Sequence, residues 1–206
     1  MVRRMNFRSE RSLYKRKCDL CGKEIIAMYH SDVPFPVYCQ DCWYSDKWNP
    51  LEYGLEFNQN ESFLKQFHDL QNLVPRSQYL AYASARLVGS PYTNCSGDLE
   101  NCYLIFGALN DRNCAYSHYI NDSRDCFDVL YSTKSERGYE CFDIENCYNL
   151  IYSQSCQNCI DSAFLFDCRN CQNCMGCSSL RNKSYYIFNK PYTKEEYQKK
   201  KSELGL

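Results

Sequence analysis

The 206-residue sequence predicts a mainly β protein: an N-terminal zinc ribbon, then a short parallel β-helix of about 21 residues per coil with a C-terminal capping helix. Three observations predict it. Two Cys-x-x-Cys pairs lie near the N-terminus, like residues recur at intervals of 21 from about Asn94 onward, and a capping box precedes the last basic segment. Short β-prone segments separated by Asn, Asp, Ser and Gly suit one strand on each side of a coil.

The first chemical motif is the pair Cys18-x-x-Cys21 and Cys39-x-x-Cys42, with 17 residues between the two pairs. Each turn brings two thiolates to one side of a cation, and two such turns complete tetrahedral S₄ coordination of Zn²⁺ at about 2.3 Å. Gly22 permits the tight backbone of the first turn. Four protein ligands leave no open coordination position, so we expect a structural zinc ion; a rubredoxin-like iron site is the alternative.

The repeat is the second motif. At a spacing of 21 residues Cys126, Cys147 and Cys168 align, and so do Asp125, Asn146 and Asp167. A coil of three strands and three corners matches that length, and each coil would lie about 4.8 Å above the last. Residues 94–188 would then supply about four coils. Antiparallel hairpins or a propeller blade would need longer repeats or tighter turn signals.

These motifs divide the chain into five segments: a basic arm (1–17), the zinc ribbon (18–50), a linker with one short helix (51–93), the cysteine-rich β-helix repeat (94–190) and a C-terminal helix (191–206). The linker helix is expected to begin near Asn60 or Ser62 and to end at Pro75. Its apolar face carries Phe63, Phe67, Leu70 and Val74.

The C-terminal helix begins with a capping box formed by Thr193 and Glu196. We expect this helix to lie over the open end of the stack, because solenoids need their terminal edges covered.

A second cysteine cluster, Cys168, Cys171, Cys174 and Cys177, has two residues between successive members. Its spacing resembles a ferredoxin run and raises the alternatives of an iron–sulfur cluster or a second metal site. The other interpretation is that these cysteines are small residues inside the β-helix. The repeat partners of Cys168 and Cys177 at minus 21 favour that second interpretation.

Composition and the N-terminal sequence indicate the cellular compartment. The net charge is −1, and the sequence contains 16 cysteines. The N-terminus lacks the apolar segment of a signal peptide, and no run approaches the roughly 18 apolar residues of a transmembrane helix. We therefore expect a cytoplasmic protein with no membrane partner, whose thiols are free or bound to metal.

The basic arm is the candidate for nucleic-acid contact. Residues 1–17 hold seven basic side chains against one Glu, with Phe7 and Tyr14 among them. Cations with interleaved aromatic rings suit phosphate contact and base stacking. The alternative is a solubilising tail or a segment packed on the acidic remainder of the chain. The candidate contact residues are Arg3, Arg4, Arg8, Arg11, Lys15, Arg16 and Lys17.

Enzymatic signals are weak. The three histidines fall in no metalloprotease or nucleophile pattern, and there is no glycine-rich phosphate loop. A polysaccharide-cleaving β-helix would need its carboxylates to converge, and Asp125, Asp128, Asp143 and Asp161 are the candidates. The sequence favours a non-enzymatic zinc-binding scaffold or interaction protein whose partner is protein or nucleic acid. A polysaccharide enzyme or binding module and a redox or iron–sulfur protein are the alternatives.

Three strings carry a resemblance: RSERSLYKRKCDLCGKEII, VYCQDCWYSDKWNPLEYG and CMGCSSLRNKSYYIFNKPYTKEEY. Together they resemble an uncharacterised family of cysteine-rich zinc-ribbon proteins found mainly in candidate-phylum bacteria with small genomes. The resemblance covers most of the chain. It implies zinc binding in the cytoplasm and a short member of the family, because relatives often carry further cysteine pairs upstream.

Overall fold

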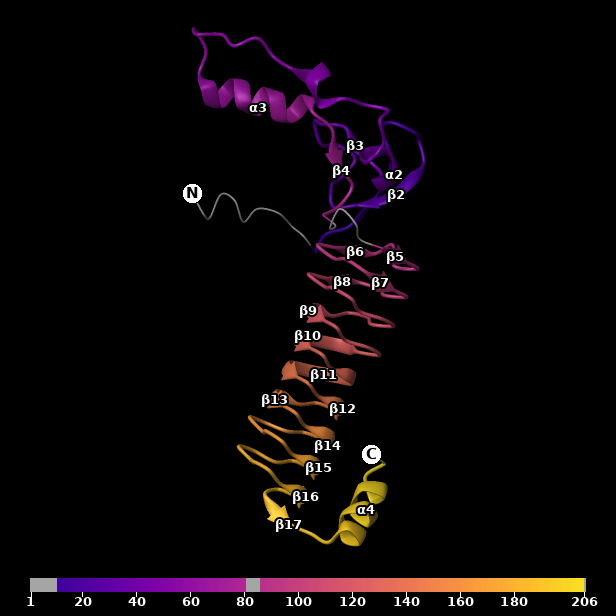
Figure 1. Ribbon diagram of the computed structural model, residues 1–206, viewed down its shortest axis with the longest axis vertical. Helices are drawn as coiled ribbons and strands as arrows, with labels where there is room; N and C mark the ends of the chain where they lie inside the picture. The colour runs from indigo at the N-terminus through magenta and orange to yellow at the C-terminus, as the bar shows by residue number, and fades with distance from the viewer. Residues whose placement is uncertain (1–10, 81–85, 206) are drawn as a thin grey trace. The chain divides into compact units, whose positions relative to one another are not determined.

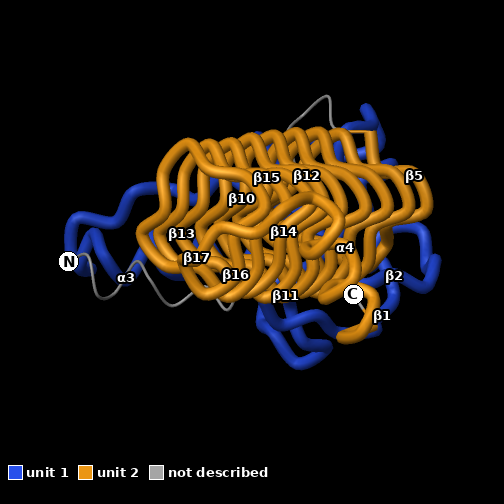
Figure 2. Tube along the Cα trace, turned by 90° about the horizontal axis from the view of Figure 1, so that it is seen from below, with its two compact units in different colours: residues 1–80 blue, residues 81–206 orange. Residues whose placement is uncertain are grey.

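The structure is a computed structural model that describes residues 11–80 and 86–205 (Figure 1). The chain forms two compact units, residues 1–80 and residues 81–206 (Figure 2). The predicted basic-arm residues Arg3, Arg4 and Arg8 lie outside the described residues.

Unit 1 is a small β structure with short helices. The antiparallel hairpin of β1 (Tyr14–Lys17) and β2 (Glu24–Ala27) is followed by β3 (Val37–Tyr38), which pairs in parallel with β4 (Arg76–Ser77). The helical segments are α2 (Gln40–Trp43), the 3₁₀ turn η1 (Pro50–Tyr53) and α3 (Phe63–Leu73). Its core is built from Ile25, Ala27, Phe35, Val37, Tyr38 and three of the predicted metal ligands, Cys18, Cys39 and Cys42.

The linker helix is α3. Ser62 is its N-cap residue, and its C-cap, Val74, is extended because Pro75 follows. None of the eleven residues of α3 is buried. On the expected apolar face Phe63 and Phe67 are exposed, whereas Leu70 and Val74 are half-buried.

Unit 2 is a stack of short strands that runs from one end of the unit to the other (Figure 1). The strands are β5 (Leu87–Val88), β6 (Thr93–Asn94), β7 (Leu99–Glu100), β8 (Ile105–Phe106), β9 (His118–Asn121), β10 (Phe127–Thr133), β11 (Glu136–Glu145), β12 (Tyr148–Ile151), β13 (Gln154–Gln157), β14 (Ile160–Ala163), β15 (Gln172–Met175), β16 (Ser184–Ile187) and β17 (Lys190–Pro191).

The predicted parallel β-helix is confirmed, but its coil length is wrong. Parallel partners lie twelve residues apart throughout: Leu87 pairs with Leu99, Phe106 with His118, and Ile160 with Gln172. About eight turns fill residues 87–187. The prediction of 21-residue coils with three strands each, about four of them from Asn94 onward, is therefore replaced by coils of twelve.

A three-residue period explains that error. From Cys95 to Phe188 every third residue has a positive φ, between 47° and 63°, and the residue after it faces the interior. Non-glycine residues adopt this left-handed conformation at a cost of about 1–2 kcal/mol, and Asn and Asp tolerate it best. Twenty-one is a multiple of three but not of twelve. Residues 21 apart therefore share the same place in the three-residue period but not the same place in the coil. For this reason the 21-residue alignment placed interior cysteines together, and it also placed the left-handed residues Asp125, Asn146 and Asp167 together.

The interior is held by side chains that hydrogen-bond to the next coil. The Oγ atoms of buried serines accept the backbone N–H twelve residues later, as in Ser117 to Val129 (3.2 Å) and Ser135 to Cys147 (3.3 Å). Interior cysteines face the same N–H, and that of Cys159 opposes the rise that burial causes in the pKa of Cys147. Each thiol also donates to a carbonyl two residues earlier, at 3.2–3.4 Å. Small side chains that both donate and accept are therefore favoured inside the coil.

Amide ladders run along the outside. Asn158 donates to Asn170 and Asn170 to Asn182, at 3.0 and 2.9 Å. Asn113 donates to Asp125 at 3.0 Å. These ladders have the twelve-residue spacing of the coils, and each one ties consecutive left-handed positions together.

The C-terminal helix α4 (Lys194–Glu203) has the predicted capping box of Thr193 and Glu196. Its position differs from the prediction. Buried Tyr197 packs on Met175 and Ile187, so α4 lies alongside the last coils instead of over their open end (Figure 1). The edge of β16 is paired with the antiparallel strand β17. That pairing meets the need for a covered edge and leaves α4 free to bury apolar surface.

The coil length gives a direct test. Duplicating residues 147–158 adds one complete coil and is expected to leave unit 2 folded, because the stability of such stacks is nearly additive. Duplicating 21 residues, 147–167, keeps the three-residue phase but displaces the following chain by three quarters of a coil. It is expected to lower the unfolding midpoint in urea, followed by circular dichroism. Equal tolerance of both insertions would contradict the twelve-residue coil.

Asp111 gives a second test, on pH. Burial raises its pKa to about 8; its Oδ1 accepts from Ser123 N–H at 2.8 Å, and Oδ2 has no partner among the described residues. The folded chain thus keeps a proton that the unfolded chain releases above about pH 4, and stability falls as the pH rises toward 8. Asp111, Ser123 and Ser135 occupy the same interior column. Asp111→Ser therefore places a hydroxyl where the next two coils already have one.

We expect Asp111→Ser to be more stable than wild type at neutral pH by about 1 kcal/mol or more, with a flatter pH dependence. Urea unfolding between about pH 5 and pH 9 measures both effects. The control is Ser135→Ala, which removes an uncharged hydrogen-bond acceptor and should lower the free energy of unfolding by the same amount at every pH. An unchanged slope in Asp111→Ser would show that Asp111 does not titrate in this range.

Candidate metal centre and the other predicted sites

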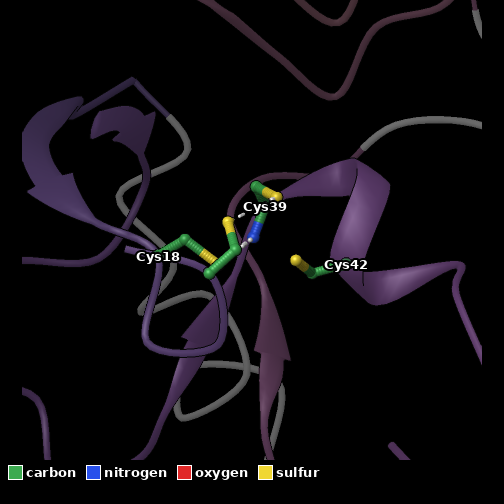
Figure 3. A group of neighbouring side chains, drawn as sticks. Cys18, Cys39 and Cys42 are labelled. Atoms are coloured by element: carbon green, nitrogen blue, oxygen red, sulfur yellow. Dashed lines mark hydrogen bonds between the residues drawn. The ribbon is translucent and has the colours of Figure 1, made fainter. Parts of the chain in front are cut away.

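The four cysteines predicted as metal ligands meet in unit 1. The Sγ atoms of Cys18, Cys21, Cys39 and Cys42 all lie within 4.8 Å of one another, and those of Cys21 and Cys39 are 3.9 Å apart. A tetrahedron with metal–sulfur bonds of about 2.3 Å requires sulfur atoms about 3.8 Å apart. Figure 3 shows Cys18, Cys39 and Cys42 gathered around one point. The group could hold a metal ion.

Two different local structures supply the ligands. Cys18 and Cys21 lie in the turn between β1 and β2, which is closed by Gly22 N–H to Cys18 C=O at 2.9 Å and has Gly22 at φ +74°. Cys39 is the N-cap residue of α2 and Cys42 lies within that helix. The N–H of Cys39 donates to Cys18 Sγ at 3.3 Å, so the two turns are joined directly at the sulfur atoms.

Asp19 provides a second link between the two turns. Its carboxylate accepts from Val37 N–H at 2.6 Å and from the Arg16 guanidinium at 2.8 Å. Arg16 also donates to His30 C=O at 2.8 Å, and its side chain is only 5% exposed. Arg16, predicted as a nucleic-acid contact, therefore supports the cysteine site and is not available to a phosphate.

The electrostatics of the site favour a cation. Burial opposes ionisation of Cys18, but backbone N–H groups of Cys39, Cys21 and Leu20 outweigh it and lower the pKa of Cys18 to about 7. Burial, followed by the neighbouring thiols, raises the pKa of Cys42 to about 12, and burial also raises the pKa of Cys39. Four thiolates this close repel one another unless a positive ion lies between them. Three of the ligands are buried and Cys21 is exposed, so an ion can enter from the Cys21 side.

The second cysteine cluster has a different environment. Cys168, Cys171, Cys174 and Cys177 are successive interior residues of unit 2, and each thiol donates to backbone carbonyls. Within residues 11–80 and 86–205 only the Cys18 group brings its ligand atoms close enough for a metal ion. All 16 cysteines lie in these ranges, and none of them forms a disulfide.

The other predicted residues are dispersed. Arg11, Lys15 and Lys17 are exposed in unit 1. Asp125 and Asp161 occupy one corner column of the coils, three coils apart, whereas Asp128 and Asp143 lie in two other columns. The structure therefore does not bring together the four carboxylates on which a polysaccharide-cleaving site would depend.

Unit 2 also carries a row of aromatic rings that was not predicted from the sequence. One corner of the β-helix carries one aromatic ring in each of seven successive coils: Tyr92, Tyr103, Tyr116, Phe127, Tyr139, Tyr152 and Phe164. We call this row the aromatic spine. Four of the six neighbouring pairs are in ring contact, with centroids 5.2–5.7 Å apart: Tyr92–Tyr103, Tyr103–Tyr116, Tyr139–Tyr152 and Tyr152–Phe164. The rings lie in two neighbouring columns of the coil, and a twelve-residue alignment places Tyr103, Phe127 and Tyr139 in one column and Tyr92, Tyr116, Tyr152 and Phe164 in the other.

No helix in the described part of the chain is long and apolar enough to cross a membrane. No protein-family model, no curated protein and no solved structure matches this chain.

The metal centre predicts one bound ion per chain. Cys39→Ser removes a ligand and should lose the ion and unfold unit 1, because a site of this kind and its fold form together. Elemental analysis measures the ion, and limited proteolysis measures the fold of each unit. Cys174→Ser is the matched control: it changes a buried thiol of unit 2 and should keep the ion. Two ions per chain, with one lost in Cys174→Ser, would instead place a second site in the Cys168–Cys177 cluster.

Proposed function

We propose that this protein is a non-enzymatic, zinc-binding scaffold whose aromatic spine contacts a protein partner. Zn²⁺ is the ion that four thiolates in a closed tetrahedral set suit best, and its role is to hold unit 1 together. We also propose that the chain belongs to the cysteine-rich zinc-ribbon family that its sequence resembles.

The aromatic spine is the observation that carries the proposal. Six of its rings, Tyr92 being the exception, are 42–51% exposed and lie along one corner. Monomeric proteins rarely keep contiguous apolar surface of this kind in water, and aromatic side chains dominate protein interfaces. The interior offers no competing site, because its thiols and hydroxyls are used between coils.

The rings of the spine cover part of one another's faces. Tyr152 and Phe164 are stacked with their planes 16° apart, whereas Tyr92–Tyr103, Tyr103–Tyr116 and Tyr139–Tyr152 meet edge to face. Both the edges and the uncovered faces of such rings pack well against the side chains of a protein partner.

The basic arm supplies a second contact surface in this proposal. Arg11, Lys15 and Lys17 are exposed, and together with Arg3, Arg4 and Arg8 they would bind nucleic-acid phosphates with a steep salt dependence. Deleting residues 1–13 removes four of these side chains and spares β1 and Arg16.

A photo-crosslinking amino acid at Tyr139, in the middle of the spine, tests the function in cells that express the protein. Tyr116→Asn with Tyr152→Asn should abolish the cross-linked protein product, because Asn keeps the left-handed backbone but removes two rings. Tyr119→Asn with Tyr131→Asn is the matched control: these left-handed tyrosines are equally exposed and stacked, but on another corner. Equal loss in both pairs, or a product abolished by nuclease, would contradict protein binding by the spine.

A further inference from the structure

The aromatic spine carries two charged residues in its middle. Asp128 and Glu140 lie in the same column as Tyr116 and Tyr152, in the two coils between those rings. Within residues 91–164, all of which the structure describes, they are the only charged side chains in the two columns that form the spine. This corner is therefore apolar along its length and acidic at its centre.

The two carboxylates repel each other. Phe127 pairs with Tyr139 in the parallel ladder, so the residues that follow them, Asp128 and Glu140, lie in neighbouring coils whose backbones are about 4.8 Å apart. Both residues are exposed. Like charges in neighbouring strands are destabilising, whereas the asparagine ladders of another column occupy left-handed positions of the same kind without repulsion. The two charges therefore do not contribute to the stability of the stack.

The chain does not neutralise these charges itself. Neither carboxylate forms an ion pair within residues 11–80 and 86–205. Arg124 and Arg137 belong to the adjoining corner, and the guanidinium of Arg137 lies over the ring of Tyr148, 5.6 Å from its centroid. A hydrogen bond to Glu140 and the charge of that carboxylate raise the pKa of Tyr139 to about 12, so its hydroxyl group stays uncharged at neutral pH.

The surroundings of the two carboxylates suit an organic cation. Tyr116, Phe127, Tyr139 and Tyr152 are 42–51% exposed, and an aromatic face attracts a cation through its quadrupole. A guanidinium group fits this environment best, because it is planar, stacks on aromatic rings and donates two hydrogen bonds to one carboxylate. Phosphate groups of a nucleic acid or of an anionic membrane would be repelled.

These observations define the partner's chemistry. Given that the spine binds a protein, which is the proposed function on which this inference rests, we propose that the partner places an arginine side chain against Asp128 and Glu140, with apolar side chains before and after it along the spine. The guanidinium group pairs with the two carboxylates and contacts the rings of Phe127 and Tyr139. Binding thus replaces a repulsion between like charges with charge-assisted hydrogen bonds.

Neutral substitutions test the arginine separately from the rings. The photo-crosslinking amino acid replaces Tyr139 of the full chain, and Asp128→Asn with Glu140→Gln removes both charges while keeping every other ring. The yield of the cross-linked protein product should fall about tenfold or more, because the cation of the partner is left without its carboxylates. The unfolding midpoint in urea should stay at the wild-type value or rise, since a repulsion is removed.

Asp122→Asn with Glu145→Gln is the matched control. These two exposed carboxylates lie on the opposite corner of the coil, and their loss changes the net charge by the same amount. The amide oxygens that replace them can still accept the hydrogen bonds from Asn110 and Gln157. This variant should give the wild-type yield of the product.

Mass spectrometry of the wild-type product identifies the segment of the partner that is cross-linked, which should contain an arginine within about four residues of the cross-link, on the order of 13 Å of extended chain. A segment without arginine, an equal loss of product in the control, or a lowered unfolding midpoint of the neutral variant would overturn the proposal.

The two proposals fail in different ways. A product that disappears in Tyr116→Asn with Tyr152→Asn but keeps its yield in Asp128→Asn with Glu140→Gln would overturn the arginine contact and leave protein binding by the spine intact. A product that survives both pairs of substitutions, or no product from the wild-type sequence, would overturn the proposed function and this inference with it.

Discussion

The hydrogen bond from an interior N–H to the side chain one coil earlier is the interaction that explains why Ser and Cys are so frequent inside unit 2, beside Leu, Ile and Val. A left-handed residue at every third position turns the backbone so that the N–H of the next, interior residue points along the stack. A buried N–H without a partner costs about 1–3 kcal/mol. Ser117 and Ser135 supply that partner from twelve residues before, and Cys147 faces the N–H of Cys159 in the same way. The unusual composition follows: Ser and Cys are the small side chains that accept this bond and still donate a proton to a carbonyl.

Cysteine therefore has two physical roles in one chain. In unit 2 it is a small, buried, hydrogen-bonded side chain. Burial raises the pKa of Cys141, Cys147 and Cys168 and keeps these thiols protonated, whereas hydrogen bonds from neighbouring thiols lower the pKa of Cys102 and Cys177. In unit 1, backbone N–H groups aimed at Cys18 and the closeness of three further sulfur atoms favour a bound cation. Spacing alone does not separate the roles, because Cys-x-x-Cys is both a metal-binding turn and two consecutive interior positions of a three-residue period. The partners of the sulfur atoms do separate them.

This ambiguity decides what could be predicted from sequence. The Cys18 site was predictable because two isolated Cys-x-x-Cys pairs at this separation are typical of a four-thiolate metal site. The capping box of Thr193 and Glu196 was predictable because it is local. The coil length was not, because the interior tolerates Cys, Ser, Leu, Ile or Val in any column, so no residue type marks the twelve-residue period. The amide ladders mark it better: Asn158, Asn170 and Asn182 bond to one another, and only side chains in register can do so.

The remaining constraint is the left-handed backbone, and it connects the fold to the proposed function. Asn and Asp meet it at little cost, yet Tyr116, Tyr152 and Phe164 occupy such positions. Bulky residues there are destabilising unless neighbouring contacts compensate. Stacking between Tyr152 and Phe164 offsets part of that cost, but an Asn ladder would satisfy the same backbone and leave no apolar surface in water. Structural needs alone therefore do not select rings at this corner. The rings at this corner are therefore the surface that the proposed protein partner would contact.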